Sequence, residues 1–244
     1  MDQTKSYFSN KMNLFYSKNI FLKPQKLSKE ESLHCIRVLR KKENDELFIT
    51  EGKGIIYIAK ITTIKNDLVN YSELTIHSKF NRKTNTHIFI SLPKKRSRFE
   101  WFLEKVTEIG VDTISPLVCK NSEREKINFN RCQRILIAAI KQSKNHILPQ
   151  LTEPILFKEA IKNQVGHAYL AHCYSSEKKI FKEVLLESKN PKKISLFIGP
   201  EGDFSKKELN FANAESIIPI SLGQNILRTE TAGIVGCNMI NLLT

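Results

Sequence analysis

Cysteine is scarce in this 244-residue sequence, and no two cysteines form a C-x-x-C pair. The five are scattered along the chain, at Cys35, Cys119, Cys132, Cys173 and Cys237. An odd, unpaired set argues against a disulfide framework and against a structural zinc site, so we expect a reducing compartment. The six histidines show no H-x-x-x-H spacing, and we predict no metal centre.

Long apolar runs are also missing. No stretch approaches the roughly 20 apolar residues that a membrane-spanning helix needs. The first residues, MDQTKSYFSNKMNLFYSKN, lack the apolar core of a signal peptide. We therefore expect a cytoplasmic protein with no membrane partner.

Acidic residues are fewer than basic ones, 25 against 39, which gives a formal net charge of +14. Such a surplus favours a polyanionic partner, most often a nucleic acid. A generally basic surface without a specific partner is the alternative that charge alone leaves open. The length fits one large domain or two modest ones.

The first 80 or so residues have the pattern of a small β-rich domain. Ser28 and Glu31 form a candidate capping box before a short helix. The segment 45–64 reads as two strands joined at EGKG, and 71–78 as a third. KFNRKTNT, residues 79–86, is polar and basic and is typical of a linker.

After this linker the predicted strands and helices alternate. Ser97 is expected to cap the first helix and Gly110 to close it. Alternation with short connections predicts a parallel sheet covered on both faces. The predicted strands are 87–93, 112–119, 167–173, 193–199 and 216–222, and the predicted helices are 97–110, 130–145, 178–188, 205–214 and 229–243.

Two strand–helix junctions are rich in glycine, and ligands of open α/β sheets collect at such junctions. In the first, SLFIGPEGDFSKKEL, a tight turn is followed by a capping box of Ser205 and Glu208. Neither phosphate-loop pattern is present, and acids at a helix start favour a ligand with hydroxyls, an amine or a positive centre. A plain strand–helix connection is the alternative.

The second junction is ISLGQNILRTETAGIVGCNMI, residues 220–240. Its loop carries Leu227 and Arg228, and Gly233 and Gly236 follow within the next helix. Each helix glycine costs about 1 kcal/mol relative to alanine. We therefore expect something to approach this helix closely, either a neighbouring segment of the protein or a cofactor.

Together the two junctions resemble the paired C-terminal signature of the bacterial ribosomal RNA small-subunit methyltransferase E family. KVTEIGVDTISPL, AAIKQSKNHILPQL and LHCIRVLRKKENDEL resemble further family segments in the expected order, so the similarity spans about residues 12–243. Asp203 departs from the family pattern, because many members carry a third glycine there. Lys144 and Asn145 replace a run that usually contains arginine.

The resemblance implies an α/β fold of two parts. A small PUA-like β-barrel, an RNA-binding domain, is expected at 12–80, after an extension at 1–11. A SPOUT-type, trefoil-knotted, parallel-sheet methyltransferase domain is expected at 81–244. A homodimer is also implied, with the last helix at the contact or only in the core.

The implied activity is S-adenosylmethionine-dependent methylation of N3 of a uridine near the 3′ end of 16S ribosomal RNA in the small subunit. The two junctions and the end of the 167–173 strand then form the cofactor walls. The residues implied are Leu170, His172, Gly199, Pro200, Glu201, Gly202, Leu222, Gly223, Ile226 and Leu227.

Uracil N3 must lose a proton near the moment of attack. Arg228 is the candidate for a cation that stabilises the uracil anion, with contact to an RNA phosphate or to its helix's neighbours as the alternative. Glu108 is a candidate base, with a surface ion pair to Lys105 as the alternative.

Basic runs are expected to contact RNA phosphates. They contribute Arg37, Arg40, Lys41, Lys94, Lys95, Arg96 and Arg98. Gln142 either holds the target base or makes an ordinary buried hydrogen bond. Two other functions stay open: methylation of a ribose 2′-hydroxyl by a related knotted enzyme, and RNA binding by an assembly factor without catalysis.

Overall fold

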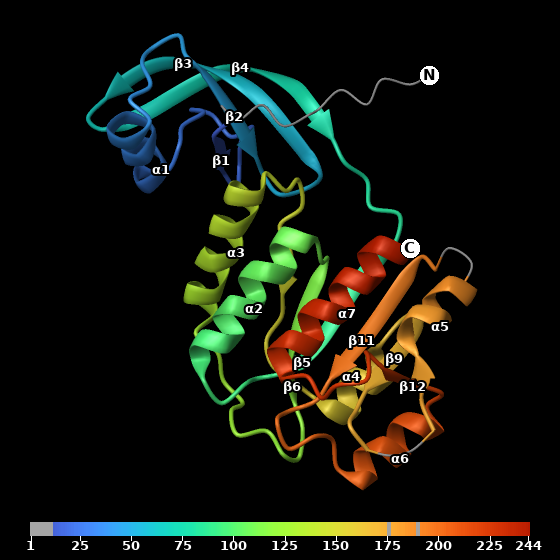
Figure 1. Ribbon diagram of the computed structural model, residues 1–244. Helices are drawn as coiled ribbons and strands as arrows, with labels where there is room; N and C mark the ends of the chain where they lie inside the picture. The colour runs from blue at the N-terminus through green and yellow to red at the C-terminus, as the bar shows by residue number, and fades with distance from the viewer. Residues whose placement is uncertain (1–11, 175–176, 189–190) are drawn as a thin grey trace. The chain divides into compact units, whose positions relative to one another are not determined.

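The computed structural model describes residues 12–174, 177–188 and 191–244, so the predicted extension at 1–11 lies outside the described residues. The chain forms two compact units (Figure 1). The first unit contains the residues up to Asn81 together with Ile140–Ile147, and the second contains Arg82–Ala139 and Leu148–Thr244. The segment 140–147 joins the first unit because its backbone bonds there: the Gly54 N–H donates to the His146 carbonyl at 2.9 Å.

The first unit contains one four-stranded sheet with the order β1-β2-β3-β4. Its strands are β1 (Leu14–Tyr16), β2 (Glu46–Thr50), β3 (Ile55–Lys65) and β4 (Leu68–Lys79). β1 runs parallel to β2, and the other pairs are antiparallel. The predicted turn at EGKG joins β2 to β3, and Gly54 has φ +88° where an added Cβ would meet the Phe80 carbonyl.

The helix of the first unit differs from its predicted capping. α1 (Lys29–Leu33) continues as a π-helical stretch, η1 (His34–Val38). The Ser28 hydroxyl accepts the Glu31 N–H at 3.2 Å, as expected. The Glu31 carboxylate, however, pairs with Lys141 instead of completing the box, because the segment 140–147 brings an ammonium group to it.

The second unit contains an eight-stranded parallel sheet with the order β10-β12-β9-β11-β5-β6-β7, and β8 pairs with β6. The strands are β5 (Asn85–Ser91), β6 (Thr113–Val118), β7 (Gln150–Leu151), β8 (Ile155–Leu156), β9 (His167–Ala171), β10 (Lys179–Ile180), β11 (Lys193–Ile198) and β12 (Ile218–Ser221). The five long strands are those predicted from the sequence. The two-residue strands β7, β8 and β10 were not predicted.

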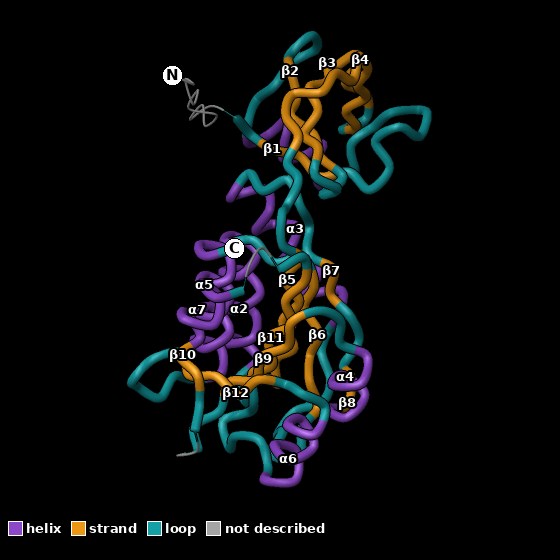
Figure 2. The backbone as a smooth tube through the Cα atoms, turned by 90° about the vertical axis from the view of Figure 1, so that its right-hand side faces the viewer, coloured by secondary structure: helices purple, strands orange, loops and turns teal. Residues whose placement is uncertain are grey.

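Helices cover both faces of this sheet, which confirms the predicted α/β class; Figure 2 shows α2, α5 and α7 on one side and α4 on the other. The first face carries α2 (Arg96–Ile109), α3 (Phe129–Ser143), α5 (Phe181–Glu187) and α7 (Thr229–Leu243) over one apolar cluster. The second carries α4 (Phe157–Asn163) and α6 (Lys206–Ala214) over another. No described helix is long and apolar enough to cross a membrane.

The glycines of α7 allow close packing of the helix. An added Cβ at Gly233 would lie 2.5 Å from the Phe102 ring, and one at Gly236 would overlap Leu196. Side chains of α2 and β11 therefore fill the space that these glycines leave. Of the two expectations for Gly233 and Gly236, a neighbouring segment of the protein is the one observed.

One local prediction is wrong. α2 begins after Lys95, which makes no side-chain cap bond, and Ser97 lies inside the first turn. The predicted linker 79–86 contains the boundary between the two units, between Asn81 and Arg82. Its Arg82 pairs with Asp112 at 3.0 Å and donates to the Gly110 carbonyl at 3.0 Å. β5 then begins at Asn85.

Candidate functional site

The carboxyl ends of β9, β11 and β12 meet at one edge of the sheet, because these neighbouring strands are parallel. The loops that follow them line a cavity of about 510 Å³. The first wall is the loop 199–203, after β11, of which all residues but Gly202 line the cavity; the second wall is residues 222–228, which lead into α7. Both glycine-rich junctions of the sequence therefore line the same cavity.

Eight of the ten predicted cofactor residues line this cavity. They are His172, Gly199, Pro200, Glu201, Leu222, Gly223, Ile226 and Leu227. Leu170 does not, because it is buried in the apolar cluster under α4 and α6. Gly202 does not either, and its carbonyl accepts a hydrogen bond from the Asn121 side chain at 3.1 Å.

The acids of the first wall hold backbone groups of neighbouring loops. Glu201 Oε1 accepts the Lys94 N–H, from the loop after β5, at 3.1 Å. Asp203 Oδ2 accepts the Cys173 N–H, from the loop after β9, at 2.7 Å. Asp203 Oδ1 accepts the Phe204 N–H at 2.7 Å. The sequence linked these acids to a positive ligand, and the structure shows that they also bind the protein's own loops.

The capping acid of α6 extends this pattern. Glu208 Oε1 accepts the Lys120 N–H, from the loop after β6, at 2.8 Å. Its Oε2 accepts from Ser205, which receives the Glu208 N–H in return, so the predicted capping box is present. Three acids between 201 and 208 thus connect the first wall and α6 to the loops after β5, β6 and β9.

Asp203, the departure from the family pattern, adopts φ +57°. Aspartate reaches this left-handed region more readily than most residues, because its short side chain bonds locally. Both of its carboxylate oxygens are used in this way. The aspartate therefore adopts the backbone conformation that glycine favours and adds two hydrogen bonds.

The glycines of the cavity have different roles. A Cβ at Gly199 would lie 2.9 and 3.0 Å from two ring atoms of the buried Phe204, so this glycine makes room for a side chain of the protein. At Gly223, φ is +152° and nothing lies within 4 Å of an added Cβ.

The second wall makes few contacts. The Gly223 N–H and carbonyl bond only to the nearby Ser221 hydroxyl. Among the described residues, no protein group accepts the backbone N–H groups of residues 224–228. Ile226 is 82% exposed, and Arg228 is exposed and makes no side-chain cap bond at the start of α7. This loop therefore offers the cavity both apolar side chains and unpaired donors.

Thr229 and Glu230, which follow the second wall, are buried and connect α7 to the rest of the site. The Thr229 hydroxyl donates to the Gly199 carbonyl at 3.0 Å. Glu230 is 4% exposed, and its Oε1 lies 3.5 Å from Arg98 Nε. Its Oε2 has no hydrogen-bond partner among the residues that the structure describes. Glu230 is not among the site residues predicted from the sequence. The signal that could have identified it is an acidic residue in an otherwise apolar helix.

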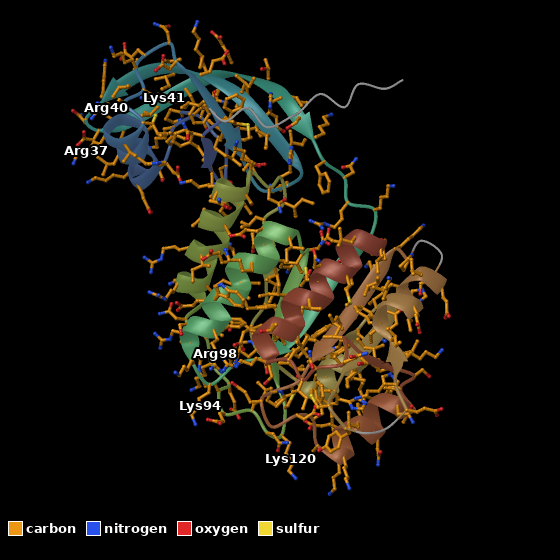
Figure 3. The ribbon with its side chains drawn as sticks, in the orientation of Figure 1. Arg37, Arg40, Lys41, Lys94, Arg98 and Lys120 are labelled. Atoms are coloured by element: carbon orange, nitrogen blue, oxygen red, sulfur yellow. The ribbon has the colours of Figure 1, made fainter. Side chains whose placement is uncertain are left out.

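Arg98 lies between two carboxylates of the second unit. Besides Glu230, its Nη1 is 4.0 Å from Glu201 Oε1. The Arg98 side chain is 28% exposed, so most of it is withdrawn from solvent. Figure 3 shows Arg98 at the start of α2, with Lys94 and Lys120 at the same end of this unit. The charge triad Arg98–Glu201–Glu230 joins α2, the first wall and α7.

Two further cavity residues have shifted proton affinities. Burial, assisted by Lys178, lowers the pKa of His172 although Asp203 opposes this effect. Burial and Asp203 raise the pKa of Cys173. At neutral pH the imidazole is therefore uncharged and the thiol is protonated.

Glu108 is not brought to the cavity. It pairs with Lys105 at 2.9 Å, and Lys105 also binds Glu104. Along α2 it lies about 15 Å from Arg98, at 1.5 Å per residue. The structure therefore shows the surface pair that was the alternative to a catalytic base.

The remaining basic candidates divide between the two units. Arg37 pairs with Asp67 at 3.2 Å and lies with Arg40 and Lys41 near α1 (Figure 3). Lys94 pairs with Glu123 at 2.9 Å. Lys95 and Arg96 are exposed beside it, and Gln142 is exposed on the part of α3 that belongs to the first unit. Among the described residues, no group of three potential metal ligands occurs.

Comparison with known proteins gives consistent matches. A family model described as an RNA methyltransferase domain matches residues 81–241, and one described as an RNA methyltransferase PUA domain matches residues 27–70. A relative from Synechocystis sp., named ribosomal RNA small subunit methyltransferase E, is 30% identical over 216 residues, which are 86% of this chain and 71% of the relative.

Two solved structures extend this similarity to the fold. The crystal structure of a probable rRNA-methyltransferase from Porphyromonas gingivalis is 31% identical, with a TM-score of 0.87 over 95% of this chain and 98% of that chain. A methyltransferase from Legionella pneumophila, solved in complex with the cofactor SAM, is 25% identical, with a TM-score of 0.79 over the same shares.

Proposed function

The chain belongs to the ribosomal RNA small subunit methyltransferase E family, and on that premise we propose that it methylates N3 of one uridine near the 3′ end of 16S ribosomal RNA. S-adenosylmethionine is the proposed methyl donor. The observation that carries the proposal is the single cavity formed by both glycine-rich junctions within the matched methyltransferase domain. The Legionella structure with bound SAM supports the choice of cofactor.

The chemistry of the cavity fits this cofactor. Ile198, Leu222 and Leu227 provide apolar surface for an adenine ring. The unpaired N–H groups of residues 224–228 provide donors for its nitrogens and for ribose oxygens. When bound, the cofactor supplies a methyl group on a positively charged sulfur.

The protein's own residues then align the uracil and manage its charge. Uracil that loses the N3 proton carries negative charge on its ring oxygens, and a fixed cation stabilises such charge strongly where water is excluded. Arg228 is the proposed cation because it lines the cavity and binds no acid among the described residues. Leu227 and Ile226 are suited to excluding water, which strengthens the interaction of Arg228 with the uracil anion.

We further infer the binding of the RNA and the assembly of the enzyme. Lys94, Lys95 and Arg96, which are exposed, are proposed to bind phosphates in the second unit. Arg37, Arg40 and Lys41 are proposed to do so in the PUA domain. A homodimer, a trefoil knot in residues 81–244 and a cytoplasmic location are part of the same proposal. Exposed Trp101 and Leu242 on helices α2 and α7 support a dimer contact.

The test is methyl transfer from labelled S-adenosylmethionine to unmodified small ribosomal subunits, with the product nucleoside identified by mass spectrometry. We expect one 3-methyluridine per subunit. A methylated ribose supports the 2′-hydroxyl enzyme instead. Cofactor binding without transfer leaves the cavity assignment intact but contradicts the substrate, and absence of binding supports the assembly factor.

A further inference from the structure

We propose that Glu201 is the proton acceptor for uracil N3, held in place by Arg98 and Glu230. This inference rests on the proposed function and assigns a step for which neither the comparisons nor the sequence names a residue in the cavity. It follows from which proton-accepting groups line the cavity, and from which of their atoms are free.

The described cavity lining contains three groups able to accept a proton at neutral pH: His172, Glu201 and Asp203. Asp203 has both oxygens occupied by backbone N–H groups. His172 is 9% exposed, and its Nδ1 is buried without a hydrogen-bond partner among the described residues. Of these three, Glu201 combines access with an oxygen that has no partner in the part of the chain that the structure describes: the Lys94 N–H is on Oε1, and the side chain is 33% exposed.

Arg98 and Glu230 determine where the Glu201 carboxylate lies. Arg98 Nη1 is 4.0 Å from Glu201 Oε1, on the oxygen that also binds Lys94. On the other side of the same guanidinium, Glu230 Oε1 lies 3.5 Å from Arg98 Nε. The contacts of Arg98 and of the Lys94 N–H with Glu201 are both on Oε1, so among the described residues Oε2 has no partner and is left for the substrate. Arg98 is thus a positioning residue rather than the RNA-phosphate ligand that its basic run suggested.

The step balances without any further reactant. The N3–H bond of uracil breaks and its proton moves to Glu201 Oε2. The electron pair left on N3 forms the new bond to the methyl carbon, and the pair of the broken carbon–sulfur bond remains on sulfur, which becomes neutral. The protonated Glu201 then returns its proton to solvent after the product leaves.

The decisive variant is Glu201→Gln, because its side-chain carbonyl still accepts the Lys94 N–H while the group no longer takes a proton. With unmodified small subunits, we expect kcat to fall by about 10²–10⁴-fold, the usual contribution of a general base. In wild type, kcat is expected to be flat between neutral and alkaline pH. In the variant, log kcat is expected to rise by about one for each pH unit, since hydroxide replaces the carboxylate.

Two controls separate catalysis from binding and folding. The Kd for S-adenosylmethionine, measured by calorimetry, is expected to stay within about threefold of wild type in Glu201→Gln. Glu208→Gln is the matched variant: it also removes the charge of an acid that accepts a backbone N–H, but Glu208 does not line the cavity. We expect Glu208→Gln to keep the wild-type kcat and its flat pH profile, with only a lower Tm.

Three results overturn the inference. If Glu201→Gln keeps the wild-type kcat, the role of Glu201 is only to accept the Lys94 backbone N–H. A variant with weakened cofactor binding and an unchanged pH profile makes it a cofactor residue. If the rate becomes hydroxide-dependent in His172→Asn but not in Glu201→Gln, His172 is the residue that accepts the N3 proton. In the same assay, a wild-type chain that forms no 3-methyluridine contradicts the proposed function itself.

Discussion

The two walls of the cavity are built in opposite ways. In the first wall, Glu201 and Asp203 bind backbone N–H groups of the loops after β5 and β9, and Asn121 binds two of its carbonyls. In the second wall, the hydrogen bonds of residues 222–228 to other described residues reach only near neighbours along the chain, and Ile226 is largely exposed. The first wall is fixed by hydrogen bonds to other loops. The second wall is anchored by Leu222 and Leu227, which pack against the core, and leaves Ile226 and its backbone donors without partners among the described residues.

This difference explains why the loop before α6, in a position that often binds phosphate, can carry acidic residues. A loop before a helix offers N–H groups that usually attract anions. Here Asp203 and Glu208 already occupy the Phe204 and Ser205 N–H groups at the start of α6. The free donors lie instead in the second wall, so we expect the ligand to bind mainly through that wall while the first wall keeps its shape.

Arg228→Ala should produce the largest effect, and it acts on the second wall. Removing a cation that stabilises transition-state charge should lower kcat by about 10²–10³-fold. Because Arg228 is exposed, the free energy of unfolding should change by less than about 0.5 kcal/mol. Single-turnover methyl transfer and denaturant unfolding measure the two quantities. If Arg228→Ala keeps a near-normal kcat, Arg228 takes no part in the mechanism. If Arg228→Lys restores the kcat that Arg228→Ala loses, a positive charge alone suffices.

Asp203→Ala should be next, and it acts on the first wall. The change removes two charge-assisted bonds to backbone N–H groups and leaves alanine at φ +57°. We expect a loss of about 3 kcal/mol in the free energy of unfolding, measured by urea denaturation, together with weaker cofactor binding. Asp203→Gly, which relieves the backbone conformation, should lose less. Equal losses of unfolding free energy in the two variants would mean that the left-handed conformation of residue 203 does not destabilise Asp203→Ala.

Glu208→Ala should have a smaller effect, because it removes the helix cap without touching the cavity. Loss of the capping box and of the Lys120 bond should cost about 1–2 kcal/mol of stability, seen as a lower urea midpoint. The Kd for S-adenosylmethionine should not change. If the cofactor affinity falls as well, the capping box of α6 and the cofactor-binding function of the first wall are not independent.

Ile226→Ser should have the smallest effect on stability and still be informative. An 82% exposed side chain contributes little to folding, so unfolding should shift by less than about 0.5 kcal/mol. If this side chain covers the bound cofactor, calorimetry should show affinity falling by roughly threefold to tenfold, in proportion to the apolar area lost. An unchanged affinity places Ile226 outside the binding surface.

Local sequence signals predicted the parts of the site that depend on neighbouring residues. Ser205 and Glu208 are three apart, and their capping box is complete. The Ser28–Glu31 box is only half formed, because the partner of Glu31 is Lys141, 110 residues away. The surroundings of Arg98 show the same limit: its run is basic and predicts contact with RNA, but the carboxylates of Glu201 and Glu230 beside it come from other elements. The strands β7, β8 and β10 have two residues each, too few to show a period.

The most direct test of the two-wall account is amide hydrogen exchange of the full chain with and without S-adenosylmethionine. Exchange reports local opening, and donors without partners exchange fastest. We predict that the N–H groups of Lys94, Cys173 and Phe204 are protected in the free protein and change little. The N–H groups of residues 224–228 should be unprotected when free and become protected on binding. Protection that instead appears only in the first wall would contradict the account.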